Sequence, residues 1–182
     1  MHSIKSVLLL TGILLLAPAA ISFGLEEPGP GITQERSSER VMLILRGIAN
    51  DEYPRGVLDD EVALEYARRN GFRGEVIDVA ADYGPDSAQI RLALERIRRD
   101  GSVTAIYGFS GGGYNTRVIW QQLSTIERDR IRSIVIVGSP GVEDVQFVGK
   151  PEVIIVPDPP EGHMAGPRSL LDGNPAATPR GR

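Results

Sequence analysis

The 182-residue sequence contains no cysteine. This absence excludes disulfide bonds, a thiolate nucleophile and a thiolate-bound metal. Histidine is scarce, because the chain has only His2 and His163. With so few nitrogen and sulfur ligands we expect no metal site. Basic residues form no excess, since 20 Lys and Arg stand against 24 Asp and Glu. We therefore expect no nucleic-acid partner, because such a partner requires a basic surface.

The N-terminus has the features of a secretory signal peptide. Lys5 supplies the positive charge, residues 7–16 are apolar, and Ala17-Pro18-Ala19 fits the small-residue cleavage pattern. We predict that residues 1–19 are a signal peptide and that the protein is secreted or periplasmic. The alternative is an uncleaved N-terminal membrane anchor with weak membrane association, because residues 7–25 carry no charge and could span a bilayer.

One folded domain is predicted between two irregular segments. Residues 20–40 and 172–182 are rich in Gly, Pro and polar residues, which is typical of a flexible linker and of a disordered tail. The domain, residues 41–171, contains five apolar runs of strand length, rich in Val and Ile. They are residues 41–45, 75–79, 103–107, 134–137 and 153–156. Continuous apolar runs favour strands of a parallel sheet that is covered on both faces.

Helical patterns separate these runs. One apolar stripe begins at Leu58 and ends before Gly71, and a second runs from Ile90 to Ile97, with Asp86 as the expected N-cap. A third stripe begins at Ile119. Alternating strands and helices predict a three-layer α/β/α fold with a five-stranded, mostly parallel sheet.

The run Gly108-Phe109-Ser110-Gly111-Gly112 has the G-x-S-x-G pattern of a serine nucleophile. It follows a buried run and precedes a stretch, residues 114–126, that is compatible with a helix. A serine at such a turn projects its hydroxyl above the sheet edge, and the helix N-terminus offers free N–H groups. The alternative is a structural glycine-rich turn. A phosphate-binding loop is disfavoured, because the run lacks the P-loop Lys and no G-x-G-x-x-G follows the first strand. We expect no cofactor.

A serine nucleophile needs a base, and histidine titrates in the right range. If His2 is removed with the signal peptide, His163 is the candidate base. It follows the last apolar run, whereas Ser110 follows the third and Gly47 the first. The carboxyl ends of parallel strands lie at one edge of a sheet, so these three residues should converge there together with Gly138-Ser139, which follow the fourth apolar run.

On these residues, Tyr107 to Gly112 and Gly162-His163 above all, the sequence resembles the α/β-hydrolase superfamily. In size it is similar to the cutinase-like enzymes, and the doubled glycine is similar to thioesterase and lipase elbows. The resemblance covers residues 41–171 and implies the strand order second, first, third, fourth, fifth.

The resemblance implies Ser110 as the nucleophile, His163 as the base and the N–H of Gly111 as one oxyanion donor. The second donor would be the N–H of Gly47 or Ile48, although this chain has Arg46-Gly47-Ile48 where the family often shows His-Gly. The third member of the triad would be Asp158, which directly follows the fifth apolar run. Glu143 and Asp144 are the alternatives, and Glu161 is a poorer one.

Together these features predict an exported serine hydrolase that cleaves small-molecule esters or thioesters. The alternative is a non-catalytic module that keeps the hydrolase fold for binding.

Overall fold

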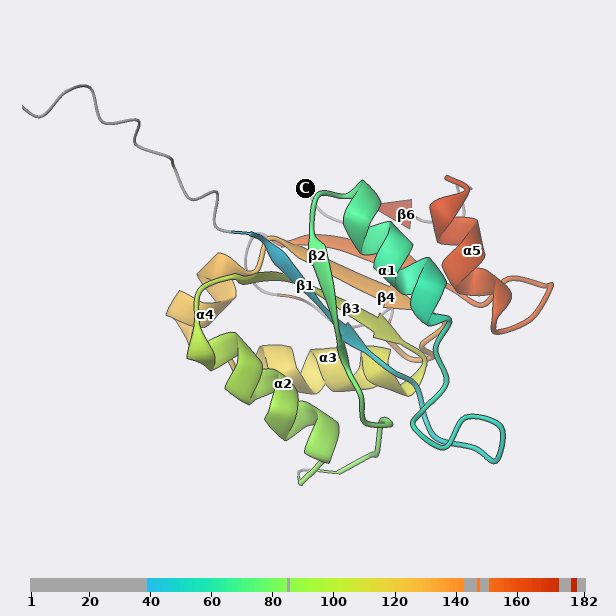
Figure 1. The fold of residues 1–182 in the computed structure, drawn as a ribbon, viewed down its shortest axis with the longest axis horizontal. Coiled ribbons are helices and arrows are strands. Elements are labelled where there is room, and N and C mark those ends of the chain that lie inside the picture. Colours follow the sequence, from blue (N-terminus) through green and yellow to red (C-terminus); the bar gives the residue numbers. More distant parts are fainter. Residues whose placement is uncertain (1–38, 85, 143–146, 148–150, 174–177, 180–182) are drawn as a thin grey trace, which may run out of the picture. The chain divides into compact units, whose positions relative to one another are not determined.

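The computed structural model describes residues 39–84, 86–142, 147, 151–173 and 178–179. In this part of the chain a six-stranded sheet has the order β2-β1-β3-β4-β5-β6 (Figure 1). The strands are β1 (Val41–Leu45), β2 (Arg73–Ile77), β3 (Val103–Phe109), β4 (Ser133–Val137), β5 (Glu152–Val156) and β6 (Thr178–Pro179). The first five are all parallel, which confirms the predicted sheet and its order. β6 is antiparallel to β5.

Helices cover both faces of the sheet (Figure 1). They are α1 (Asp60–Arg69), α2 (Ala88–Arg99), α3 (Gly111–Gln122), α4 (Thr125–Arg130) and α5 (Ala165–Leu171). Successive strand residues point to opposite faces, so β1 contributes to two cores. Leu43 and Leu45 pack with α2 and α3, whereas Met42 and Ile44 pack with α1. Both sides of β1 are therefore buried, which explains why its sequence is continuously apolar.

Two details of the sequence prediction are wrong. β2 begins and ends two residues earlier than the apolar run 75–79, because Arg73 pairs with Val41 at the start of β1. Val79 lies beyond the strand, where its N–H donates to Ile77 O. The N-cap of α2 is Ser87 rather than Asp86, since Ser87 Oγ accepts a hydrogen bond from Ile90 N.

Residues 1–38, which include the predicted signal peptide and most of the predicted linker, lie outside the described residues. Within the tail predicted for residues 172–182, Thr178–Pro179 form β6. No helix of the described residues is both long enough and apolar enough to cross a membrane.

Candidate active site

Ser110 lies in the sharp turn between β3 and α3. Its φ of 52° and ψ of −122° make it the one residue other than glycine with a positive φ in the described part of the chain. Such a conformation is strained by about 1–3 kcal/mol and persists only where the surrounding structure holds it. Ser110 is the N-cap of α3, but its side chain makes no capping hydrogen bond. The hydroxyl is therefore not bound to the helix it precedes.

Two glycines around Ser110 are required by close contacts. A Cβ on Gly108 would lie 2.5 Å from Thr116 Oγ1 and 2.6 Å from Gly112 O. A Cβ on Gly112 would lie 2.5 Å from Leu45 O. Both distances are well inside van der Waals contact, so any larger residue would separate α3 from β1 and β3. The pattern G-x-S-x-G thus follows from the close approach of backbone segments.

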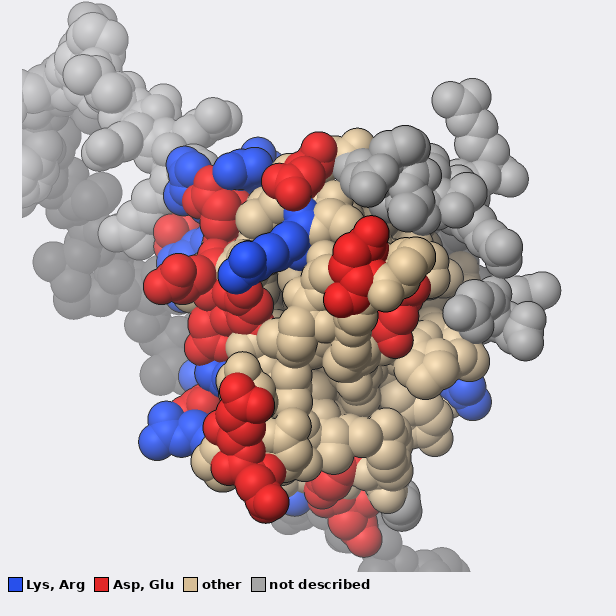
Figure 2. Space-filling view, turned by 90° about the vertical axis from the view of Figure 1, so that its right-hand side faces the viewer, with Lys and Arg blue, Asp and Glu red and all other residues tan. Residues whose placement is uncertain are grey.

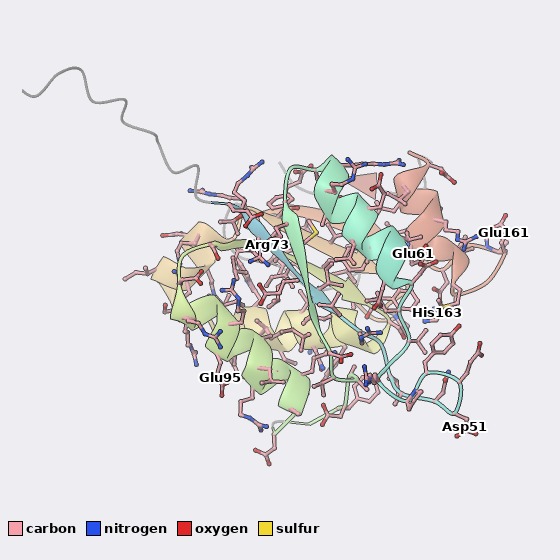
Figure 3. The ribbon with its side chains drawn as sticks, in the orientation of Figure 1. Asp51, Glu61, Arg73, Glu95, Glu161 and His163 are labelled. Carbon is pink, nitrogen blue, oxygen red and sulfur yellow. The ribbon has the colours of Figure 1, made fainter. Side chains whose placement is uncertain are left out.

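His163 lies in the loop between β5 and α5, at the same end of the sheet as Asp51 in the loop after β1 (Figure 3). Its Nδ1 is 2.7 Å from Asp158 Oδ1. Because the carboxylate accepts a hydrogen bond, Nδ1–H is the donor, and Nε2 is the ring nitrogen that this bond leaves free. Both side chains are partly open to solvent, with 38% of His163 and 49% of Asp158 exposed.

Three contacts place this pair beside the elbow. The His163 ring packs on Phe109, the residue before Ser110, with ring centroids 4.7 Å apart. Ser110 N donates to Val137 O at 2.8 Å. The next residue, Gly138, would place a Cβ 2.5 Å from Asp158 Oδ1 and 2.9 Å from His163 Cε1. The hydrogen bonds among the described residues include none between Ser110 Oγ and His163.

The two candidates for a second oxyanion donor differ in their hydrogen bonds. Gly47 N donates to Val57 O at 2.8 Å, so its proton is already used. No acceptor for Ile48 N occurs among the backbone hydrogen bonds of the described residues. A Cβ on Gly111 would lie 3.4 Å from this nitrogen. The geometry thus favours Ile48 over Gly47 as the partner of the Gly111 N–H at the start of α3.

Two other titratable residues near the elbow, Arg46 and Tyr107, are not available as catalytic bases. Arg46, which stands where the resemblance led us to look for a histidine, donates from Nη2 to Asp60 at 2.6 Å. Tyr107 lies three residues before Ser110 and is fully buried. Burial raises its pKa far above the ordinary value, so the phenol stays protonated and cannot serve as a base.

Of the alternatives to Asp158, the structure describes Glu161, and no hydrogen bond joins Glu161 to His163 among the described residues. Glu161 is exposed and lies further out on the same loop (Figure 3). Glu143 and Asp144 lie outside the described residues. Of the acids that the structure describes, Asp158 is the one bonded to the imidazole.

The edge of the sheet that carries Ser110 is acidic. Figure 2 shows more red than blue side chains around an uncharged central area on the face that it draws. A hollow of about 350 Å³ has Met164, the residue after His163, in its lining. It is lined by Arg46, Tyr53, Leu58, Asp59, Asp60, Glu61 and Met164. Carboxylates dominate this lining, so the hollow suits uncharged or cationic groups better than anions.

Two features of the site were missed by sequence reasoning. Gly138 was seen only as a residue after a strand, and its contact with the Asp158–His163 pair depends on the tertiary fold. Gln89 and Asn115 are polar, yet both are completely buried. The sequence contains one indication of their burial. Gln89 is four residues before Ala93 and Asn115 is four residues before Ile119, so each lies on the apolar face of its helix.

Comparisons with known proteins add little at the level of sequence. The chain matches no protein-family model and no curated protein. It is similar in structure to a protein from Xanthomonas campestris pv. campestris that is described as a candidate hydrolase of the alpha/beta superfamily. The two are 17% identical, with a TM-score of 0.42 over 75% of this chain and 81% of that one.

Proposed function

We propose that the protein is an exported serine hydrolase that cleaves carboxylic esters or thioesters. The observation that carries this proposal is the arrangement of three residues from distant parts of the sequence. Ser110 stands in a strained turn with an uncommitted hydroxyl, and His163 packs against the preceding residue while its Nδ1 binds Asp158. This arrangement supports a nucleophile with a base beside it and a carboxylate that orients the base.

The reaction would proceed through an acyl-enzyme. Ser110 Oγ attacks the acyl carbonyl carbon while His163 Nε2 takes its proton, and Asp158 stabilises the imidazolium. The N–H groups of Gly111 and Ile48 stabilise the negative oxygen of the tetrahedral intermediate, where a donor contributes about 3–4 kcal/mol. His163 then protonates the leaving alcohol or thiol. In the second half His163 deprotonates a water molecule, which attacks the acyl group and restores the Ser110 hydroxyl.

Ser110 Oγ and His163 make no hydrogen bond in this structure. This is compatible with the mechanism, because catalytic hydrogen bonds are often long in the absence of substrate. The same observation, together with the solvent exposure of Asp158, favours the second candidate function. In that case the chain keeps a hydrolase-like fold as a binding module without turnover.

Labelling with a fluorophosphonate probe and turnover of a chromogenic ester separate the two functions. The wild-type protein should be labelled, and Ser110→Ala should lose both labelling and activity. Ser124→Ala is the matched control, because Ser124 caps α4 at the opposite end of the sheet. His163→Ala should abolish most turnover, and the Ser110→Ala/His163→Ala double variant should be little worse because the pair acts as a unit. An unlabelled and inactive wild-type protein would support the binding module instead.

A further inference from the structure

A polar pair lies completely buried behind the candidate active site. Gln89 is on α2 and Asn115 is on α3, and neither side chain is exposed to solvent. Their neighbours in this layer are the apolar side chains of the core between the sheet and these helices. Buried amides are unfavourable unless their hydrogen bonds are made. Among the described residues Asn115 Oδ1 has no hydrogen-bond partner, whereas Asn115 Nδ2 lies 3.5 Å from the buried Ser87 Oγ and also contacts Gln89.

The hydrogen bonds of Gln89 lead to two loops at the active edge. Its Nε2 donates to Arg46 O at 3.0 Å and to Val79 O at 2.7 Å. These carbonyls belong to the loops after β1 and β2. Because both carbonyls need a donor, the amide has one allowed orientation, and its Oε1 must face a donor as well. That donor is Asn115 Nδ2, at 2.9 Å.

The pair therefore connects the two backbone segments that carry the oxyanion donors. Arg46 lies two residues before Ile48, and Asn115 lies one helical turn after Gly111. The segments also touch directly, because a Cβ on Gly112 would lie 2.6 Å from Arg46 O. Gly112 allows the two segments to approach each other closely. The hydrogen bonds of Gln89 and Asn115 then hold the loop after β1 at a defined position relative to α3.

We propose that Gln89 and Asn115 are positioning residues that fix the spacing between the N–H groups of Gly111 and Ile48. This inference rests on the proposed hydrolase function and deepens it. Neither side chain contacts the substrate or the reacting atoms. They act through the backbone of the oxyanion loop, whose donors must lie about 3 Å from the oxygen in the transition state.

The experiment replaces the pair by apolar residues of similar size. Gln89→Met and Asn115→Leu should each lower kcat about 10- to 100-fold and leave KM within about twofold, because a displaced donor affects mainly the transition state. Affinity for an alkyl boronic acid, which forms a tetrahedral adduct on serine, should fall in parallel with kcat/KM. Affinity for the carboxylic acid product should not change.

The double variant Gln89→Met/Asn115→Leu separates positioning from stability. The carbonyls of Arg46 and Val79 lose their donor in Gln89→Met and in the double variant alike, but the double variant no longer carries an unpaired Asn115 amide. Its stability in urea should therefore be no lower than that of Gln89→Met. Its kcat should be no higher than that of the weaker single variant. Asn115→Ala, like Asn115→Leu, keeps both bonds from Gln89 to the carbonyls, so it should lose less kcat than Gln89→Met, and it gives a second test should Gln89→Met fail to fold.

Ile97→Ala is the matched control, because Ile97 is buried on the same helix and packs only in the core. It should lose stability while kcat stays within about twofold of wild type. The inference is overturned if the double variant retains full kcat, if boronic acid affinity stays constant while kcat falls, or if Ile97→Ala loses as much kcat as Gln89→Met. Failure of the hydrolase function itself looks different, since the wild-type protein would then show no labelling that depends on Ser110.

Discussion

Substitution of Gly138 by alanine should separate the Asp158–His163 pair from the elbow. The added Cβ would lie 2.5 Å from Asp158 Oδ1, 2.9 Å from His163 Cε1 and 3.0 Å from His163 Nδ1. Ordinary carbon contacts are about 3.5–4 Å, so the carboxylate must move by about 1 Å. The bond between the two side chains is 2.7 Å long and cannot lengthen by that amount without being lost.

A displacement of about 1 Å at a reacting group lowers the rate about 10²-fold, and complete loss of the orienting carboxylate lowers it about 10⁴-fold. We therefore expect Gly138→Ala to lower kcat for a chromogenic ester by about 10²- to 10⁴-fold. This corresponds to a rise of about 3–5 kcal/mol in the activation free energy.

Gly141→Ala is the control for backbone strain. Gly138 has a φ of +59° and Gly141 a φ of +74°, so alanine at either position costs about 1–2 kcal/mol of stability. No atom of the described residues lies within 4 Å of a Cβ on Gly141. Both variants should show similar shifts in Tm, but only Gly138→Ala should be inactive. Equal activity of the two variants would refute the reasoning that Gly138 makes room for the pair.

Four further outcomes are expected. Asp158→Asn should lower kcat at least about 10²-fold and Glu161→Gln less than about twofold; the reverse result would reassign the acid. The acidic edge should give an uncharged ester a higher kcat/KM than an anionic ester of the same size, and 0.5 M salt should reduce the difference between the two values. Equal kcat/KM values at low salt would contradict the role of the acidic edge. A hydrogen bond from Arg96 lowers the pKa of Glu75, so this pair stabilises the fold above the unfolded pKa and loses its effect as the pH falls through the lowered one. Glu75→Gln should thus destabilise by about 1–2 kcal/mol at pH 7 in urea titrations and much less at pH 3, and a loss independent of pH would oppose this assignment. Mass spectrometry of the exported protein should find a mature N-terminus near Ala20, whereas an intact Met1 in a membrane fraction would indicate the anchor.

Much of the fold was determined locally. β1, β3 and β4 are largely apolar because helices cover both faces of the sheet, and such runs can be recognised without knowing their partners. The elbow could be recognised from the G-x-S-x-G spacing alone, although the glycine at 112 is required by Leu45 O at the end of β1, which is distant in the sequence. β6 could not be predicted, because a strand of two residues has no periodicity and depends on the free edge of β5.

What only the tertiary structure decided is how residues from separate segments meet. The sequence did not distinguish Gly47 from Ile48 as the second oxyanion donor. The structure does, because the N–H of Gly47 already donates to Val57 O and the N–H of Ile48 does not. The sequence also could not show that Gly138 faces Asp158 and His163, or that Gln89 reaches the loops after β1 and β2. Local patterns specify which residues become strands, turns and helices, since these depend on neighbours in the chain. The distances between side chains from different strands depend on sheet register and packing, which are fixed only when the whole domain has folded.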